Sequence, residues 1–163
     1  MKKFLKVFTL VFACILLVGC GEDNSSNEVK YTSNGLTITM ESGLLEKTNE
    51  NFDVYFQGSK MIFMAVEEKF DTLEIVNLDS NSTLDDYITL ILANNGESSG
   101  KLQDGDLTYF TYEREVNGQE FFYVGTAYKT DEAFWLINFA CQEKDKDEYK
   151  DLFIKYAKTI RFE

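Results

Sequence analysis

The sequence predicts an α+β domain, in which an antiparallel β-sheet meander is flanked by two amphipathic helices. Short segments with alternating apolar and polar residues indicate strands, Asn117-Gly118 indicates a tight hairpin turn, and two segments carry apolar residues at helical spacing. The chain has 163 residues, no proline and no repeat of solenoid length. We therefore expect one domain, over residues 30–163.

The elements follow in order along the chain. Strands are predicted at residues 29–32, 36–40, 52–57, 61–70, 107–116, 119–129, 133–141 and 159–162. A helix is predicted from Thr83 to Asn95, because apolar residues recur there at i, i+3, i+4, i+7 and i+8. Ser82 or Thr83 is expected to cap this helix and Gly96 to end it. A second amphipathic helix closes the chain, with Asp145 and Glu148 as the expected capping pair.

The first residues have the features of an export signal. Three lysines precede a short apolar run that ends in Leu17-Val18-Gly19-Cys20. The run is about half of the roughly 20 residues that a helix needs to cross a bilayer, and its length is typical of a signal peptide. Its end resembles the lipobox of bacterial lipoproteins. The resemblance implies that residues 1–19 are a signal peptide and that the Cys20 thiol receives a diacylglyceryl group; an ordinary secretory signal is the alternative.

The lipidated Cys20 and the polar stretch after it predict how the protein is held. Residues 20–29 contain too few apolar side chains to join a core, so we interpret them as a flexible tether. Two or three acyl chains hold a protein durably on a membrane, whereas one binds marginally. We therefore expect a lipid-anchored protein on the extracytoplasmic side of the cell membrane, with the bilayer as its partner through acylated Cys20.

Charge narrows the choice of other partners. The chain has a net charge of −12, and loss of the three leader lysines leaves −15. Nucleic acid is excluded as a partner, because phosphate binding requires a basic surface. A solvated acidic surface is the simplest interpretation, and recognition of a basic partner is the alternative.

Residue types also limit the chemistry. The chain has no histidine, which removes His-dependent catalytic triads and the commonest ligand of zinc. Cys141 is expected to be a small apolar filler, because no basic neighbour in the sequence lowers its pKa. Neither a nucleophile elbow nor a glycine-rich phosphate loop is present. We expect no enzyme activity and no cofactor; a carboxylate-based hydrolase acting on cell-envelope material is the alternative.

Three glutamates form the one weak candidate site. A two-residue loop at Asn117-Gly118 places Glu115 directly opposite Glu120, with Glu113 two residues along on the same face. Like charges in this position are unfavourable. These residues are either a solvated hairpin tip or a site for a divalent cation or a basic patch on a partner. On the other face, Arg114 is expected to lie over an aromatic ring.

Several segments together resemble the PsbP-like fold. They are the strand at residues 35–39, the helix start at residues 83–87, the aromatic meander, the strand at residues 134–141 and the final helix. The family includes the extrinsic PsbP protein of photosystem II, a Ran-binding nuclear import factor and many bacterial lipoproteins. The resemblance implies an α/β/α sandwich and a non-catalytic binding or assembly module, with no site residue to transfer. A substrate-binding lipoprotein of a transporter is the remaining alternative, and the protein partner is not identified.

Overall fold

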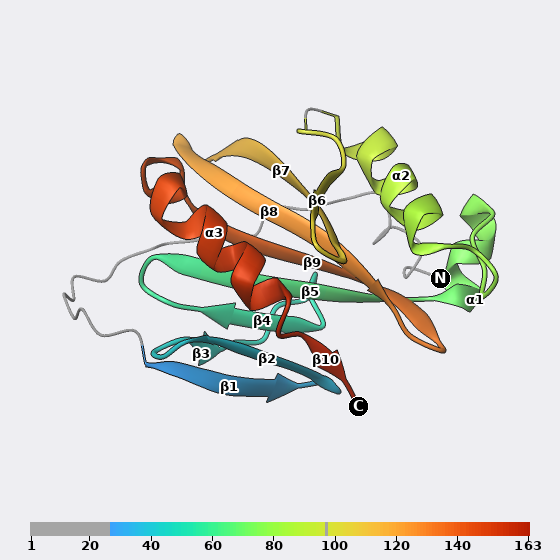
Figure 1. Ribbon diagram of the computed structural model, residues 1–163, viewed down its shortest axis with the longest axis horizontal. Helices are drawn as coiled ribbons and strands as arrows, with labels where there is room; N and C mark the ends of the chain where they lie inside the picture. The colour runs from blue at the N-terminus through green and yellow to red at the C-terminus, as the bar shows by residue number, and fades with distance from the viewer. Residues whose placement is uncertain (1–26, 97) are drawn as a thin grey trace.

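The computed structural model describes residues 27–96 and 98–163, so the predicted signal peptide and Cys20 lie outside the described residues. It contains a three-stranded sheet of order β1-β2-β10 and a seven-stranded sheet of order β3-β4-β5-β9-β8-β7-β6 (Figure 1). All pairings within both sheets are antiparallel. The predicted α+β class is therefore confirmed.

The strands are β1 (Glu28–Ser33), β2 (Leu36–Glu41), β3 (Leu45–Glu46), β4 (Val54–Gln57), β5 (Met61–Lys69), β6 (Leu102–Asp104), β7 (Leu107–Val116), β8 (Gln119–Lys129), β9 (Ala133–Gln142) and β10 (Arg161–Phe162). The helices are α1 (Phe70–Leu73), α2 (Leu84–Asn95) and α3 (Lys146–Ala157), with short 3-10 turns η1 (Glu74–Val76) and η2 (Glu143–Asp145). β1 begins two residues before the predicted start of the domain.

Helix α3 and the small sheet cover one face of the large sheet (Figure 1). The ring of Phe153 on α3 stacks on Phe139 of β9, with ring centroids 5.2 Å apart. Phe162 of β10 contacts Trp135 of β9 at the same centroid distance of 5.2 Å. These rings bury large apolar areas, so they join the closing helix and the last strand to the centre of the sheet.

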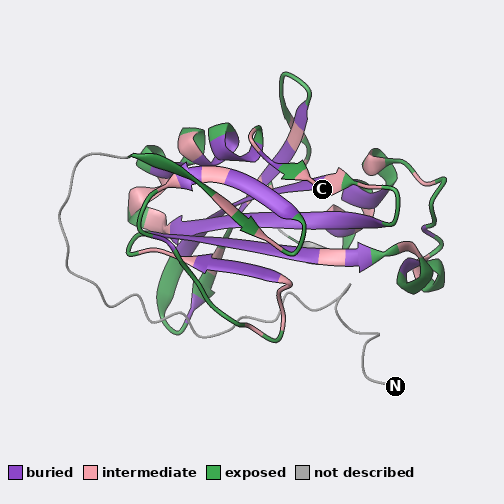
Figure 2. Ribbon diagram, turned by 90° about the horizontal axis from the view of Figure 1, so that it is seen from below, coloured by how far each residue is buried: buried purple, intermediate pink, exposed green. Residues whose placement is uncertain are grey.

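Helices α1 and α2 pack on the opposite face. The ring of Tyr87 on α2 stacks on Phe134 of β9, at 4.5 Å between centroids and 5° between planes. The helix begins as predicted, because Thr83 and Asp86 form a reciprocal capping box, and Gly96 ends it with a φ of 70°. Since both faces of the large sheet are covered, residues 133–141 of its central strand are all buried (Figure 2).

Two local predictions differ from the structure. Asp145 makes no side-chain cap to α3, because its φ of −100° and ψ of 3° are not the extended conformation that a capping residue adopts. The 3-10 turn η2, which precedes the helix, places it in this conformation. The short elements α1, η1, β3 and β6 were not predicted, since two to four residues carry too little periodicity to recognise.

Different turns lie at the two ends of the molecule. In Figure 1 the start of β1 lies at the same end as the β7–β8 turn and the start of α3. The β8–β9 turn lies toward the other end, near α1, and the C-terminus lies close to the β1–β2 turn. None of the helices in the described part of the chain is long and apolar enough to span a membrane.

Candidate functional site

The second half of strand β7 is an open edge of the large sheet. β7 pairs with β8 from Tyr109 to Val116, whereas on its other side β6 covers only Leu107 to Tyr109. Ser99 extends this cover by one position, because its N–H donates to the Thr111 carbonyl at 2.8 Å and its hydroxyl accepts from the Thr111 N–H at 2.9 Å. Beyond Thr111, no strand among the described residues pairs with this side of β7.

The backbone groups at this open edge belong to Glu113 and Glu115. Alternate residues of a strand direct their N–H and C=O groups to the same side. Thr111 directs both groups away from β8, so Glu113 and Glu115 direct theirs the same way. Asn117 and Gly118 have φ angles of 53° and 79°, and this confirms the predicted two-residue turn that sets the register.

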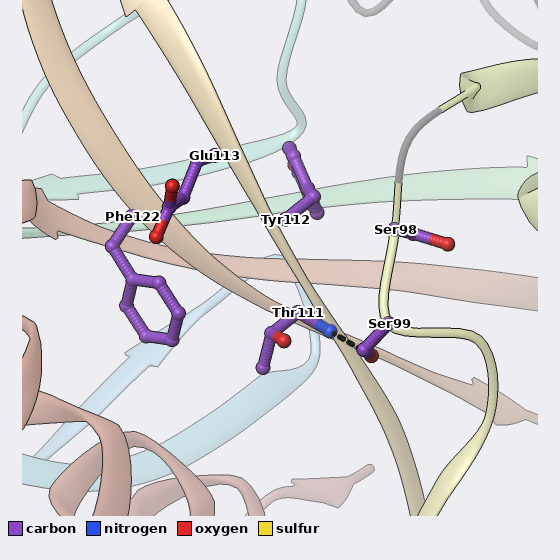
Figure 3. Close-up of a pocket in the computed structure, with 6 residues that line it drawn as sticks. All are labelled: Ser98, Ser99, Thr111, Tyr112, Glu113 and Phe122. Atoms are coloured by element: carbon purple, nitrogen blue, oxygen red, sulfur yellow. Dashed lines mark hydrogen bonds between the residues drawn. The ribbon is translucent and has the colours of Figure 1, made fainter.

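A depression of about 300 Å³ lies at the open edge (Figure 3). It is lined by Ser98, Ser99, Thr111, Tyr112, Glu113 and Phe122. In Figure 3 the two serines lie on one side of the β7 ribbon, and Glu113 and Phe122 lie on the other. The depression therefore offers hydroxyl groups on one wall, and a carboxylate beside an aromatic ring on the other.

The structure brings the predicted glutamates to one face of this hairpin. Glu115 is directly opposite Glu120, as the register requires, and Glu113 is opposite Phe122. Lys146 of α3 lies 3.2 Å from the Glu113 carboxylate and 2.6 Å from that of Glu143. These two carboxylates, Glu143 first, raise the pKa of Lys146.

Nothing in this geometry favours a metal site. Across residues 27–96 and 98–163, no group of three or more Asp, Glu or Cys side chains is placed to hold a metal ion. The described geometry therefore favours the basic-partner hypothesis for the three glutamates over the cation hypothesis.

Stacked aromatic rings support the open edge on the opposite face of β7. The rings of Tyr112 and Tyr123 stack at 4.6 Å and 4°, and Phe110 lies 6.1 Å from Tyr112. The Tyr112 hydroxyl donates to the Asn138 side-chain oxygen at 2.9 Å, and burial raises the pKa of Tyr112 well above its ordinary value. The Arg114 guanidinium lies 5.8 Å from the Tyr112 ring centroid, which confirms the predicted contact. These contacts pack this face of β7 against β8 and β9.

A second depression, of about 610 Å³, lies toward the other end of the molecule. Its lining residues are Asn34, Gly35, Glu67, Lys129, Thr130, Asp131, Glu132, Trp135, Ile160, Arg161, Phe162 and Glu163. Both of its cations already bind backbone carbonyls: Lys129 those of Ser80 and Ser82, and Arg161 those of Lys158 and Ile160. This depression therefore offers fewer unsatisfied donors to a ligand than its size suggests.

Among the described residues, the carboxyl groups of Glu41 and Glu68 have a raised pKa, and neither lines a depression described above. Burial is the main cause at Glu68, where the Tyr87 hydroxyl donates to the carboxylate and the charge of Asp53 adds to the rise. Burial is also the main cause at Glu41, beside the Tyr149 hydroxyl. A glycoside hydrolase needs two carboxyl groups facing one substrate, which these two residues do not provide in either depression.

The remaining candidate site residues are two cysteines, Cys141 and Cys20, and two serines, Ser98 and Ser99. Cys141 is buried, as predicted, with 1% of its surface exposed, and burial raises the pKa of its thiol to about 12. Cys20 lies outside the described residues. Sequence reasoning missed Ser99, because its role depends on hydrogen bonds to Thr111, 12 residues away along the chain, and it missed Ser98, which lines the same depression.

No family model matches the chain, and no curated protein matches its sequence. Solved structures do match it. The cyanobacterial PsbP protein (CyanoP) from Synechocystis sp. PCC 6803 is 15% identical, with a TM-score of 0.50 over 90% of this chain and 99% of that chain. The Ran-binding protein Mog1p from Saccharomyces cerevisiae is 8% identical, with a TM-score of 0.50 over 85% of this chain and 96% of that chain.

A Bacteroides thetaiotaomicron protein is 14% identical to the chain, with a TM-score of 0.53. The match covers 82% of this chain and 48% of that protein, so the chain spans about half of its length. Together these likenesses show that the chain has the PsbP-like fold that the sequence predicted. At such low sequence identity these likenesses show the fold alone, and the function has to be inferred from the candidate site.

Proposed function

We propose that this protein is a lipoprotein of the cell membrane, anchored through Cys20 on the extracytoplasmic side, that acts as a non-catalytic binding or assembly module. The observation that carries the proposal is the lipobox-like end of the leader, Leu17-Val18-Gly19-Cys20, close before the folded domain. β1 begins at Glu28, eight residues after Cys20. An extended chain of that length reaches at most about 28 Å, so the domain would stay near the membrane.

The described side chains support binding in preference to catalysis. The open edge of β7 offers hydrogen-bonding groups and negative charge, which can hold a partner. The Tyr87 hydroxyl, whose pKa burial raises well above its ordinary value, lies inside the domain with none of its surface exposed and has no access to a substrate. Mog1p, whose fold is similar, is itself described as a Ran-binding protein, so the fold is compatible with a binding role.

Fractionation of the full chain in its bacterial host tests the anchor. The parent protein and a Cys141→Ala control are expected in the membrane fraction, whereas Cys20→Ser is expected in the soluble fraction or retained as uncleaved precursor. Intact mass spectrometry should show a chain that starts at Cys20 and carries acyl groups. An unmodified N-terminus on the native protein would contradict the proposal.

Two further measurements test the binding role. Crosslinking in intact cells should recover a saturable partner with the parent protein and a much smaller yield with Cys20→Ser, because the soluble form is no longer concentrated at the membrane. Incubation of the purified protein with cell-wall polysaccharide should release no soluble fragments. Time-dependent release that is lost on substitution of an acidic pair would instead establish the hydrolase.

A further inference from the structure

We propose that the open edge of β7 binds an extended, basic segment of a partner protein, which adds to the large sheet as a further strand. The segment would carry Lys or Arg at alternate positions, facing Glu113 and Glu115. This inference rests on the proposed binding function and names the class of partner. The backbone groups of the edge, the length of its strand, its charge and the side chains on its opposite face each support the proposal.

The backbone provides the first argument. Between Tyr112 and Val116 the outer side of β7 has no described strand beside it, and Glu113 and Glu115 direct their N–H and C=O groups outward. Five residues of strand offer about 17 Å of edge, enough for a short peptide. Ser99 already pairs with Thr111 in this manner, so an added segment would continue an interaction that the loop begins.

The other edge of the large sheet is less suited to strand addition. There β3 has only two residues, Leu45 and Glu46, and a short edge strand offers little to an incoming chain. The edge at β7 belongs to a strand of ten residues without proline. It therefore keeps the length and the hydrogen-bonding groups that strand addition requires.

The charge of the edge indicates which kind of segment binds there. Glu113, Glu115 and Glu120 lie on one face of the hairpin, and Lys146 pairs with Glu113 and Glu143. A residue on an added strand would lie about 4.5–5.5 Å from its neighbour on β7, so a lysine or arginine there would be favoured and an acidic residue disfavoured. A second copy of this chain would place glutamates against glutamates at the same edge. We therefore infer a basic partner and not a homodimer.

The opposite face of the edge sets the alternate positions. Side chains of an added strand that point to this face would lie beside Tyr112 and Arg114, whose ring and guanidinium are already in contact. A second cation there would meet the charge of Arg114, so apolar or small residues are favoured. The recognised pattern is thus an alternation of basic and apolar residues over about five positions.

The test uses the full chain purified from membranes in a zwitterionic detergent. The probe is an eight-residue capped peptide of alternating lysine and valine. Amide NMR and hydrogen exchange should show shifts at residues 112–116 and at least tenfold slower exchange of the Glu113 and Glu115 amides. A peptide N-methylated at the amides that face β7 should bind about 5-fold more weakly for each lost hydrogen bond. A peptide with glutamate in place of lysine should not bind.

Three variants separate the contribution of backbone hydrogen bonds to peptide affinity from the contribution of charge. Glu115→Pro removes one outward N–H without breaking a bond to β8, and it is expected to reduce peptide affinity by more than Glu115→Gln, which removes only the charge. Glu120→Gln, on the same face but one strand farther from the edge, should weaken binding less than Glu115→Gln. Where Glu115→Pro does not fold, the N-methylated peptide gives the same comparison.

Several outcomes would overturn the inference. These are absence of binding at millimolar peptide, equal affinity for the N-methylated peptide, equal affinity for the glutamate peptide, and shifts confined to the depression around Trp135. The proposed anchor is judged independently in the same experiment, because the fraction from which the protein is recovered reports on Cys20 and not on β7.

Discussion

Substitution of Gly125 by alanine tests the register on which the open edge depends. Gly125 of β8 lies between Phe110 of β7 and Asn138 of β9. A Cβ atom at this position would lie 2.4 Å from Cε2 and Cζ of Phe110 and 3.1 Å from the Asn138 side-chain oxygen. Carbon atoms in favourable contact are about 3.5–4.0 Å apart, so the ring must move by about 1 Å or more.

The cost of that movement exceeds the usual benefit of the substitution. Phe110 is buried and neighbours the stacked ring of Tyr112, so it has little room to move. Overpacking of a core costs about 1–3 kcal/mol, whereas replacing a strand glycine by alanine gains about 0.5–1 kcal/mol. We expect Gly125→Ala to lower the free energy of unfolding by about 1–2 kcal/mol.

Urea unfolding and thermal melting measure the effect. A loss of 1 kcal/mol should lower the Tm by about 2–4 °C in a protein of this size. Combining Gly125→Ala with Phe110→Leu should recover part of the loss, with a coupling of about 1 kcal/mol. Gly58→Ala is the matched control, because its Cβ would meet no atom closer than 3.4 Å. A Gly125→Ala protein as stable as the parent, or a double variant without coupling, would refute the assigned register.

Three further predictions concern the buried groups and the first turn of α2. Burial raises the pKa of Glu68, so the folded state holds its proton more tightly than the unfolded chain, and this carboxyl lowers stability as the pH rises past about 4.3. Glu68→Gln should therefore be more stable than the parent at pH 7 and equal to it at pH 3 in urea unfolding; equal stability at both would be contrary to this account. Thr83→Ala should cost about 1 kcal/mol by removing the α2 cap, while Thr83→Ser should keep most of it, as followed by circular dichroism. The Cys141 thiol, whose pKa burial raises to about 12, should react with a thiol reagent at pH 8 only as fast as the domain unfolds, and rapid labelling of the native protein would show that it is accessible.

Local signals in the sequence predicted the main elements because those signals act over a few residues. Asn117-Gly118 specifies a two-residue turn by its own backbone preferences, and both residues adopt positive φ. Thr83 and Asp86 cap α2 within one turn of helix. The order of strands in the aromatic meander follows from such turns, since neighbours in sequence joined by tight turns also pair in the sheet.

The rest of the fold depends on contacts between distant residues. The cap expected at Asp145 failed because the turn before it, and not the residue type, sets its backbone conformation. The open edge was not predicted either, because it is defined by where β6 ends and by how far the loop at Ser99 follows β7. In contrast, the apposition of Glu115 and Glu120 followed from the turn alone, because a two-residue loop sets the register of the strands that it joins.

An anchor at Cys20 would give the two depressions different surroundings. β1 starts at the end of the molecule that carries the β7–β8 turn (Figure 1). A chain held by an acylated Cys20 would therefore keep the open edge near the bilayer, within reach of segments of membrane proteins. β8 has 11 residues and spans about 36 Å, so the depression around Trp135 would face away from the membrane. Anionic lipid would repel the glutamates at the near end and would favour basic polypeptide there. This effect would reach only about 8 Å from the lipid surface, which is the screening length at physiological ionic strength.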